Sequence, residues 1–344
     1  MKAIVLKKLG PLDQAHLELV DVPFPEPAAN QILVKVLTCG ICHTELDEIE
    51  GRLPPPVLPM ILGHEIVGRA DRIGLHVTRF KPGDRVGIAW IHGACGTCSF
   101  CKTDRENLCP DFQGTGYQAH GGYAEYTAVS ENFAYPIPEL FSDAEAAPLL
   151  CAGAIGYRAV KLTGLYDGQV LGLFGFGASA HLALQVVKHR FPQTKVFVFT
   201  RAGQPEHQEL ARRLGADWIG VTGQMPPAPL NAAIDFTPAW EPVAAALRVL
   251  DKGGRLVINA IRKEERDKKA LLNLDYARDL WQEKELKSVA NITRADAAEF
   301  LQIAAEIPIR PQVQEFPLAR IGEALQLLKQ GKIRGAGVLR IANR

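Results

Sequence analysis

The stretch VLGLFGFGASA at residues 170–180 decides the expected fold of the central part of this chain. An apolar run, Val170–Phe174, leads directly into two closely spaced glycines, and residues with helical spacing follow over Ala180–Arg190. A strand, a glycine-rich turn and a helix in this order, with a small residue in the third glycine position, are typical of a dinucleotide site, where the helix N-terminus meets the pyrophosphate. A glycine turn without a ligand is the alternative. The cofactor-binding residues expected here are Gly175, Gly177, Ala178, Ser179 and Ala180.

Strands and helices alternate after this turn, which favours the nucleotide site over an empty turn. The sequence predicts strands at Lys195–Phe199, Asn231–Phe236 and Arg255–Asn259, and helices at Pro205–Leu214 and Val243–Leu250. Alternation of this kind indicates βαβ units around a doubly wound parallel sheet, the Rossmann arrangement.

The segments before and after this region have a different character. Gln31–Leu37 alternates between apolar and polar residues, and glycines and prolines interrupt the first 150 residues repeatedly, so we expect short strands in a barrel or sandwich. In the tail we expect a strand at Gln312–Phe316, a helix at Ile321–Lys329 and a final strand at Gly337–Ile341.

The end of the second predicted strand bears on the choice of nucleotide. NAD-binding sites usually place an acid there, on the ribose 2′-hydroxyl. This strand instead ends in Thr200-Arg201. A guanidinium can bind a 2′-phosphate, so the dipeptide favours NADP(H), with NAD(H) as the alternative. A solvent-facing arginine with no role would look the same in the sequence.

Four cysteines lie close together at Cys95, Cys98, Cys101 and Cys109, a spacing that predicts one closed, tetrahedral structural zinc site. A disulfide framework is the alternative, but such frameworks belong to short secreted chains, and this chain has 344 residues, 47% hydrophobic residues and an odd count of seven cysteines. Three further potential ligands, Cys42, His64 and Cys151, would leave a fourth zinc position open for chemistry. We therefore expect two zinc ions per chain.

Charge and hydropathy exclude some classes of partner. With 39 basic and 38 acidic residues the net charge is +1, which provides no electrostatic footprint for nucleic acid or an anionic membrane. No apolar run reaches membrane-spanning length, and the N-terminal MKAIVLKKLG lacks the apolar stretch of a signal peptide. Reduced, metal-binding cysteines fit a cytoplasmic location.

Several motifs resemble one family. The chain carries CGICHTEL at 39–46, GHEIVG at 63–68, GGYAEY at 121–126 and LLCAG at 149–153, with the cysteine cluster and the glycine turn in the same order. This set is similar to the zinc-dependent alcohol dehydrogenases of the medium-chain dehydrogenase/reductase superfamily over essentially the whole chain.

The resemblance implies a GroES-like β-barrel catalytic domain, formed by residues 1–152 and 309–344, and a Rossmann domain at 153–308. A structural zinc lobe would occupy about 93–112. The implied catalytic zinc ligands are Cys42, His64 and Cys151, with Cys39 as a buried small residue.

The resemblance also assigns roles around the expected zinc ion. Thr44 matches the relay hydroxyl that takes the substrate proton, while Asp47 stands where the relay often has histidine. Glu65 matches an acid close behind the metal. Glu45 takes the place of an acid that orients the histidine ligand, and its side chain is longer than the usual aspartate. His43 matches a contact to the cofactor pyrophosphate.

The segment Trp90-Ile91 matches part of the substrate pocket, where an aromatic wall would favour apolar alcohols. Ordinary packing of a buried tryptophan is the alternative.

The implied activity is hydride transfer between an alcohol, primary and apolar, and NAD(P), with aldehydes or ketones as the oxidised partners. The short chain resembles microbial members that form homo-oligomers, tetramers or dimers. Two alternatives stay open: a quinone or enone reductase of the same superfamily, and a non-catalytic regulatory protein that binds zinc and nucleotide.

Overall fold

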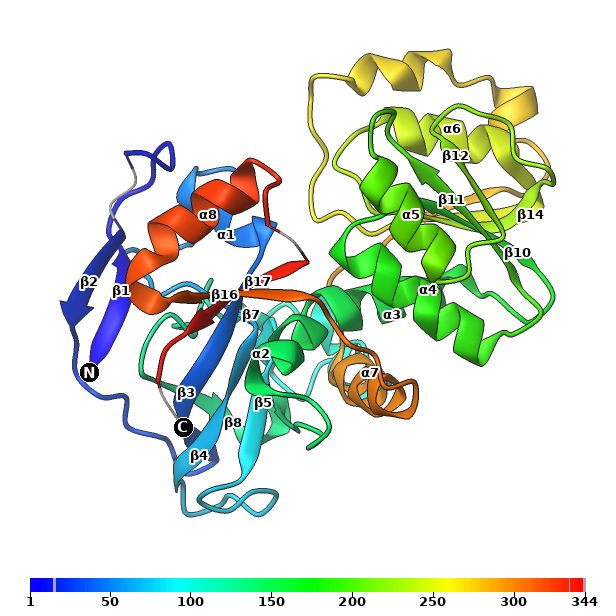
Figure 1. Ribbon diagram of the computed structural model, residues 1–344. Coiled ribbons are helices and arrows are strands. Elements are labelled where there is room, and N and C mark those ends of the chain that lie inside the picture. Colours follow the sequence, from blue (N-terminus) through cyan, green and yellow to red (C-terminus); the bar gives the residue numbers. More distant parts are fainter. Residues whose placement is uncertain (15–16, 334, 343–344) are drawn as a thin grey trace. The chain divides into compact units, whose positions relative to one another are not determined.

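The computed structural model describes the whole chain except residues 15–16, 334 and 343–344. It divides into two compact units, Met1–Cys151 with Ile292–Arg344 and Ala152–Asn291, which are described separately below (Figure 1). Among the described residues, no helix is long and apolar enough to cross a membrane.

The first unit is built around the long strand β3 (Gln31–Ile41), which pairs with three neighbours. Its main sheet has the order β16-β17-β3-β4-β5-β9, and β8 also pairs with β3. The strand runs four residues past the expected 31–37, because both its faces and both its edges are covered there. The other strands of this sheet are β4 (Ile66–Ile73), β5 (Arg85–Ile88), β8 (Tyr126–Ser130), β9 (Ala134–Pro136), β16 (Val313–Pro317) and β17 (Ala336–Arg340).

Shorter elements surround that sheet and carry much of the chemistry. A hairpin joins β1 (Lys2–Leu6) to β2 (Leu17–Asp21), and a small ribbon joins β6 (Ile91–Gly93) to β7 (Gln113–Gly114). The helices of this unit are α1 (His43–Ile49), α2 (Asp143–Ala146), α7 (Arg294–Glu306) and α8 (Ile321–Lys329). The tail strands and helix lie within one or two residues of their expected positions.

The second unit is a six-stranded, fully parallel sheet with the order β12-β11-β10-β13-β14-β15. Its strands are β10 (Val170–Phe174), β11 (Lys195–Thr200), β12 (Trp218–Val221), β13 (Leu230–Asp235), β14 (Leu250–Ile258) and β15 (Glu285–Ser288). Its helices are α3 (Ala152–Thr163), α4 (Ala178–Arg190), α5 (Pro205–Arg213) and α6 (Glu241–Val249). The predicted doubly wound sheet is confirmed.

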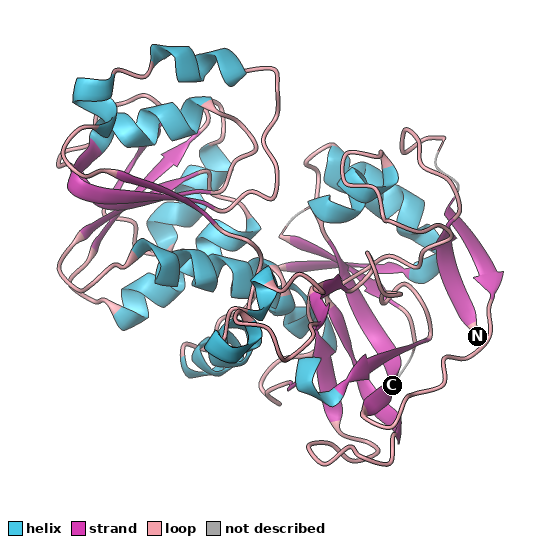
Figure 2. Ribbon diagram, turned by 180° about the vertical axis from the view of Figure 1, so that it is seen from behind, coloured by secondary structure: helices cyan, strands magenta, loops and turns pink. Residues whose placement is uncertain are grey.

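Helices cover both faces of this sheet (Figure 2), and alternate strand residues pack against each layer. Leu171 and Leu173 belong to the core beneath α3 and α4, whereas Phe174 belongs to the core beneath α6. Phe174 and Phe199 stack with ring centroids 4.1 Å apart and an interplanar angle of 3°. Burial on both faces explains why β10 and β11 are nearly continuous apolar runs in the sequence.

The compact units differ from the expected domain bounds at α7, which lies before residue 309 yet belongs to the first unit. Its first residue, Arg294, donates a backbone hydrogen bond of 2.6 Å to Glu106 Oε1, and its guanidinium lies over the Phe133 ring. The chain therefore returns to the first unit at Ile292, earlier than the tail strands alone suggested.

Candidate metal centres and nucleotide site

Cys42, His64 and Cys151 come together at one end of the main sheet in the first unit. Cys42 directly follows β3, and His64 comes two residues before β4, which is the antiparallel neighbour of β3. Cys151 ends the short turn at Ala147–Leu150. One ligand atom from each, and one carboxylate oxygen of Glu65, all lie within 4.8 Å of one another.

The geometry of this cluster fits a zinc ion. His64 Nε2 and Cys151 Sγ are 3.3 Å apart. Tetrahedral bonds of about 2.3 Å to sulfur and about 2.0 Å to nitrogen would place such atoms about 3.5 Å apart. The pKa of the Cys42 thiol lies well below its usual value, because its sulfur forms hydrogen bonds with Cys151, which has the larger effect, and with His64. No cysteine of the chain is in a disulfide.

Glu45 lies directly behind the histidine. Its Oε1 is 2.7 Å from His64 Nδ1, and both side chains are buried. Its second oxygen accepts a hydrogen bond of 2.7 Å from the backbone N–H of Cys42, which anchors the start of α1. A carboxylate at Nδ1 leaves Nε2 free to face a metal. The longer glutamate therefore reaches the position for which aspartate is more usual.

Glu65 is buried beside the cluster, and its side chain fits there because Gly40 has no side chain. A Cβ built on Gly40 would lie 1.9 Å from Glu65 Oε2, so no other residue fits there while Glu65 keeps this position. Burial raises the pKa of the Glu65 carboxyl well above its usual value. A carboxyl buried in this way is stable when it is protonated or when it faces a metal ion.

The other expected residues near the cluster differ in their surroundings. Thr44 is buried, with Oγ1 3.6 Å from Cys42 Sγ. Asp47 is also buried, but its carboxylate accepts a hydrogen bond of 2.5 Å from Arg52 Nε, which ties it to the end of α1. His43 is exposed in the first turn of α1.

Aromatic rings line one side of the cluster. The Trp90 ring meets the His64 ring edge-on at 4.8 Å, and Tyr117 stacks on Trp90 at 5.9 Å. Ile91 is fully buried in β6. The sequence analysis did not identify Tyr117, because nothing in its local pattern links residue 117 to residue 90.

Glu48 is a second residue that the sequence analysis missed. It is 1% exposed, and neither carboxylate oxygen has a hydrogen-bond partner among the described residues. Burial raises the pKa of its carboxyl well above the usual value. A glutamate one turn along a short helix resembles a surface residue in the sequence, so only its packing reveals it.

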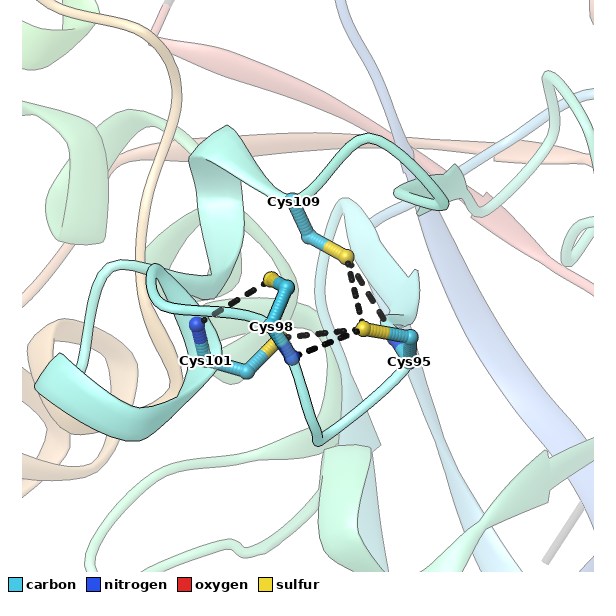
Figure 3. Close-up of side chains that lie close together, drawn as sticks. All are labelled: Cys95, Cys98, Cys101 and Cys109. Carbon is cyan, nitrogen blue, oxygen red and sulfur yellow. Dashed lines mark hydrogen bonds between the residues drawn. The ribbon is translucent and has the colours of Figure 1, made fainter.

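The four-cysteine cluster forms a separate lobe in which all four sulfurs lie within 4.8 Å of one another (Figure 3). Cys95 Sγ is 3.5 Å from Cys109 Sγ and 3.9 Å from Cys101 Sγ. Four sulfurs around one zinc ion would be about 3.8 Å apart, so the cluster fits a closed site. Backbone N–H groups of Thr97 and Cys98 lower the pKa of Cys95 to about 6, which favours its thiolate form.

The glycine turn of the second unit has the geometry expected of a nucleotide site. Gly175 has a φ of 82°, and Gly177 is the N-cap of α4, so Ala178 and Ser179 form the first helical turn and Ala180 packs in the core. The turn follows β10, and the strand order reverses between β10 and β13, where ligands of such sheets bind.

Thr200 and Arg201 mark the carboxyl end of β11. Thr200 is buried, and its hydroxyl accepts a hydrogen bond of 2.9 Å from Gln208. Arg201 is exposed, and its backbone N–H donates to Gln204 Oε1 at 3.2 Å. The end of β11 thus carries Thr200 and Arg201 at the position where NAD-binding sites usually have an acid.

Comparison with known proteins places this site in context. Residues 28–139 match the alcohol dehydrogenase GroES-like domain family. The chain is 42% identical to a probable alcohol dehydrogenase AdhA of Mycobacterium tuberculosis, over 99% of this chain and 97% of that protein. It is 33% identical to an alcohol dehydrogenase of Geobacillus stearothermophilus, over 99% of this chain and all of that protein.

Solved structures agree with these relatives. An alcohol dehydrogenase of the archaeon Aeropyrum pernix superposes with a TM-score of 0.85 at 27% identity, covering 99% of this chain and all of that one. A cinnamyl alcohol dehydrogenase of Sorghum bicolor superposes with a TM-score of 0.82 at 26% identity, covering 98% of this chain and 97% of that one.

Proposed function

We propose, because this chain belongs to the zinc-type alcohol dehydrogenases of the medium-chain dehydrogenase/reductase superfamily, that Cys42, His64 and Cys151 hold its catalytic zinc ion. The chain is an NAD(P)-dependent enzyme that interconverts alcohols and aldehydes. The observation that carries the residue assignment is the cluster of two partly buried thiols and one buried imidazole, with Glu45 fixed behind the imidazole.

The bound cofactors supply the central chemistry: zinc acts as a Lewis acid on the substrate oxygen, and the nicotinamide takes up or returns the hydride. The protein's own groups orient and exchange protons. Glu45 holds His64 in the tautomer that presents Nε2 to the metal. The Thr44 hydroxyl, buried beside Cys42, accepts the proton that an alcohol loses on oxidation while it donates its own proton to the next group of the path; on reduction both transfers run in reverse.

Asp47 is the next proposed member of the proton path beyond Thr44. Its carboxylate forms an ion pair with Arg52, whose guanidinium holds it at the end of α1. Glu65, buried against Gly40, is proposed to approach the metal when a ligand exchanges.

The substrate is proposed to be a primary, apolar alcohol or the matching aldehyde or ketone. Trp90 and Tyr117 provide a stacked aromatic surface beside His64, which favours apolar substrate carbons. Ile91, the next residue after Trp90, is buried in β6.

For the second unit we propose a nicotinamide dinucleotide on the turn from Gly175 to Ala180, with NADP(H) favoured over NAD(H). Thr200 and Arg201 support this preference, because the exposed guanidinium can pair with a 2′-phosphate. His43 at the start of α1 is proposed to contact the pyrophosphate. The four-cysteine lobe is proposed to hold the second, structural zinc ion of each chain.

The chain is further proposed to be a cytoplasmic homo-oligomer, a tetramer or a dimer. Every residue of strand β15, at the edge of the parallel sheet, is exposed. Leu286 on this strand is 51% exposed, and Trp281 nearby is 55% exposed. An exposed edge strand with apolar side chains is a natural surface for a second copy. The seven cysteines, none of them in a disulfide, support the reducing compartment.

The test compares two neighbouring cysteines. Initial rates on hexan-1-ol are measured with NAD⁺ and NADP⁺, together with zinc content, for the wild type, Cys42→Ala and Cys39→Ala. Cys39, three residues earlier in the chain, is buried and lies outside the ligand cluster. We expect Cys42→Ala to lose one zinc ion and essentially all turnover while it stays folded, and Cys39→Ala to keep both. Full activity in folded, zinc-depleted Cys42→Ala would overturn the assignment. A wild type that binds nucleotide but turns over no alcohol or aldehyde would favour the non-catalytic alternative.

A further inference from the structure

A lysine outside the motifs joins the segment after β14 to the loop after β13, beside the glycine turn of the second unit. Lys263 lies in the segment after β14, and its side chain is only 8% exposed. Its ammonium group forms an ion pair with Asp235 and donates to the backbone oxygens of Thr237 at 2.8 Å and Ala239 at 2.9 Å. These three bonds use all the donors that a lysine has.

Asp235, which pairs with Lys263, also binds Thr237. It is fully buried at the end of β13, and its second oxygen accepts bonds from the backbone N–H of Thr237 at 3.1 Å and from the Thr237 hydroxyl at 2.8 Å. Lys263 and Asp235 together therefore fix both the backbone and the side chain of Thr237.

Thr237 in turn packs closely against Gly175, the first glycine of the nucleotide turn. A Cβ built on Gly175 would lie 2.7 Å from Thr237 Cγ2, and the preceding residue, Phe236, donates its backbone N–H to Phe174 O at 2.9 Å. The loops after β10 and β13 flank the point where the strand order reverses, and this is where such sheets bind nucleotides.

The segment after β14 is also fixed at other points. The backbone N–H of Glu264 donates to Pro238 O at 2.8 Å, and Asp267 accepts bonds from the first backbone N–H groups around the start of α6, Trp240 at 2.8 Å and Glu241 at 3.0 Å. A buried ion pair costs desolvation that an apolar pair would avoid, so its presence here calls for a role beyond stability.

We propose that Lys263 and Asp235 are positioning residues for the nucleotide: they hold Thr237 against Gly175 and so set the shape of the turn that receives the pyrophosphate. The inference rests on the proposed nucleotide site but adds to it, because neither residue belongs to the glycine motif. Nucleotide affinity then depends on an ion pair whose lysine lies 88 residues beyond Gly175 in the chain.

The test measures dissociation constants for NADPH and NADH by fluorescence titration of the zinc-replete enzyme, well below its unfolding temperature. The variants are Lys263→Met, which nearly keeps the length of the side chain, and Lys268→Met as the control. Lys268 is an exposed lysine of the same segment, and it pairs with Glu265 alone among the residues that the structure describes. Turnover at saturating nucleotide is measured in parallel.

We expect Lys263→Met to weaken binding of the preferred nucleotide roughly tenfold or more, because an uncompensated Asp235 no longer holds Thr237. At saturating nucleotide, kcat stays within about threefold of the wild type, the pattern of lost binding without lost chemistry. Lys268→Met binds as the wild type does.

Unchanged affinity in folded Lys263→Met would overturn the proposal. If that variant does not fold, Thr237→Ala decides, because it removes the contact with Gly175 and leaves the ion pair in place; we expect affinity to fall roughly threefold or more, and unchanged affinity would refute the inference. A wild type that binds neither NADPH nor NADH would instead contradict the proposed function itself.

Discussion

Reversing the charge of Arg201 provides the sharpest test of cofactor choice. Its side chain is exposed, and it forms no ion pair with any residue in the described part of the chain, so the substitution Arg201→Asp changes local charge without breaking a buried contact. The buried Thr200 beside it keeps its bond to Gln208.

The exposure of Arg201 determines the size of the effect. In water, two unit charges about 4 Å apart interact by about 1 kcal/mol. The 2′-phosphate carries about −1.5 to −2 charges, and the substitution changes the side chain by two units, so the unscreened change is about 3–4 kcal/mol. Salt at about 0.15 M reduces it to about 2 kcal/mol, which is roughly a 30-fold loss in kcat/KM with NADP⁺.

The assay is kcat/KM for NADP⁺ and NAD⁺ at a fixed alcohol concentration, repeated at low and high salt. The control is Arg213→Asp, an equal charge change at the far end of α5. We expect the NADP⁺ to NAD⁺ ratio to fall in Arg201→Asp, by more at low salt, and to stay constant in the control. An unchanged ratio in Arg201→Asp would show that this arginine is an ordinary surface residue.

Three further outcomes are expected. Thr44→Val removes the buried hydroxyl and lowers kcat by roughly 10²–10⁴-fold, while Thr44→Ser retains most of it; stopped-flow proton release on alcohol oxidation measures the effect, and an unaffected Thr44→Val would exclude the relay role. Cys109→Ser opens the four-cysteine cluster, so metal analysis finds one zinc ion per chain and the unfolding temperature falls; two retained ions would contradict the assignment. Asp143→Ala removes the carboxylate that lies 2.7 Å from the Arg85 guanidinium, which is only 6% exposed. We expect the free energy of unfolding, measured by urea denaturation, to fall by about 3–5 kcal/mol. A loss below about 1 kcal/mol would show that water reaches this pair.

The second unit was largely predictable because its signals are local. Strands β10 and β11 contain short apolar runs, VLGLF and VFVF, and Gly175 takes a positive φ at the turn that follows β10. The strands that escaped prediction lie at the two edges. The sequence of β15, ELKS, is exposed throughout, so it lacks the apolar pattern from which strands are recognised.

Helix α7 of the first unit shows a different limit of prediction from sequence: the helix itself is predictable, but the unit to which it belongs is not. Thr293 and Asp296 form a capping box at its start, a signal that the sequence contains. Its membership of the first unit depends instead on contacts such as that between Arg294 and Glu106, which are 188 residues apart. Sequence spacing carries no information about such distant partners.

The sequence by itself determined what short spacings can determine: the four-cysteine lobe within 15 residues, the glycine turn, and the presence of Cys42, His64 and Cys151 as candidate ligands. Only the tertiary structure decided which distant groups meet. It brought His64 within 3.3 Å of Cys151, 87 residues away, and Lys263 onto Asp235. It also buried the Glu48 carboxylate with no hydrogen-bond partner in the described part of the chain. The physical reason is that local patterns restrict the backbone of a few residues, whereas contacts between distant residues arise only when whole strands and helices pack to bury their apolar faces.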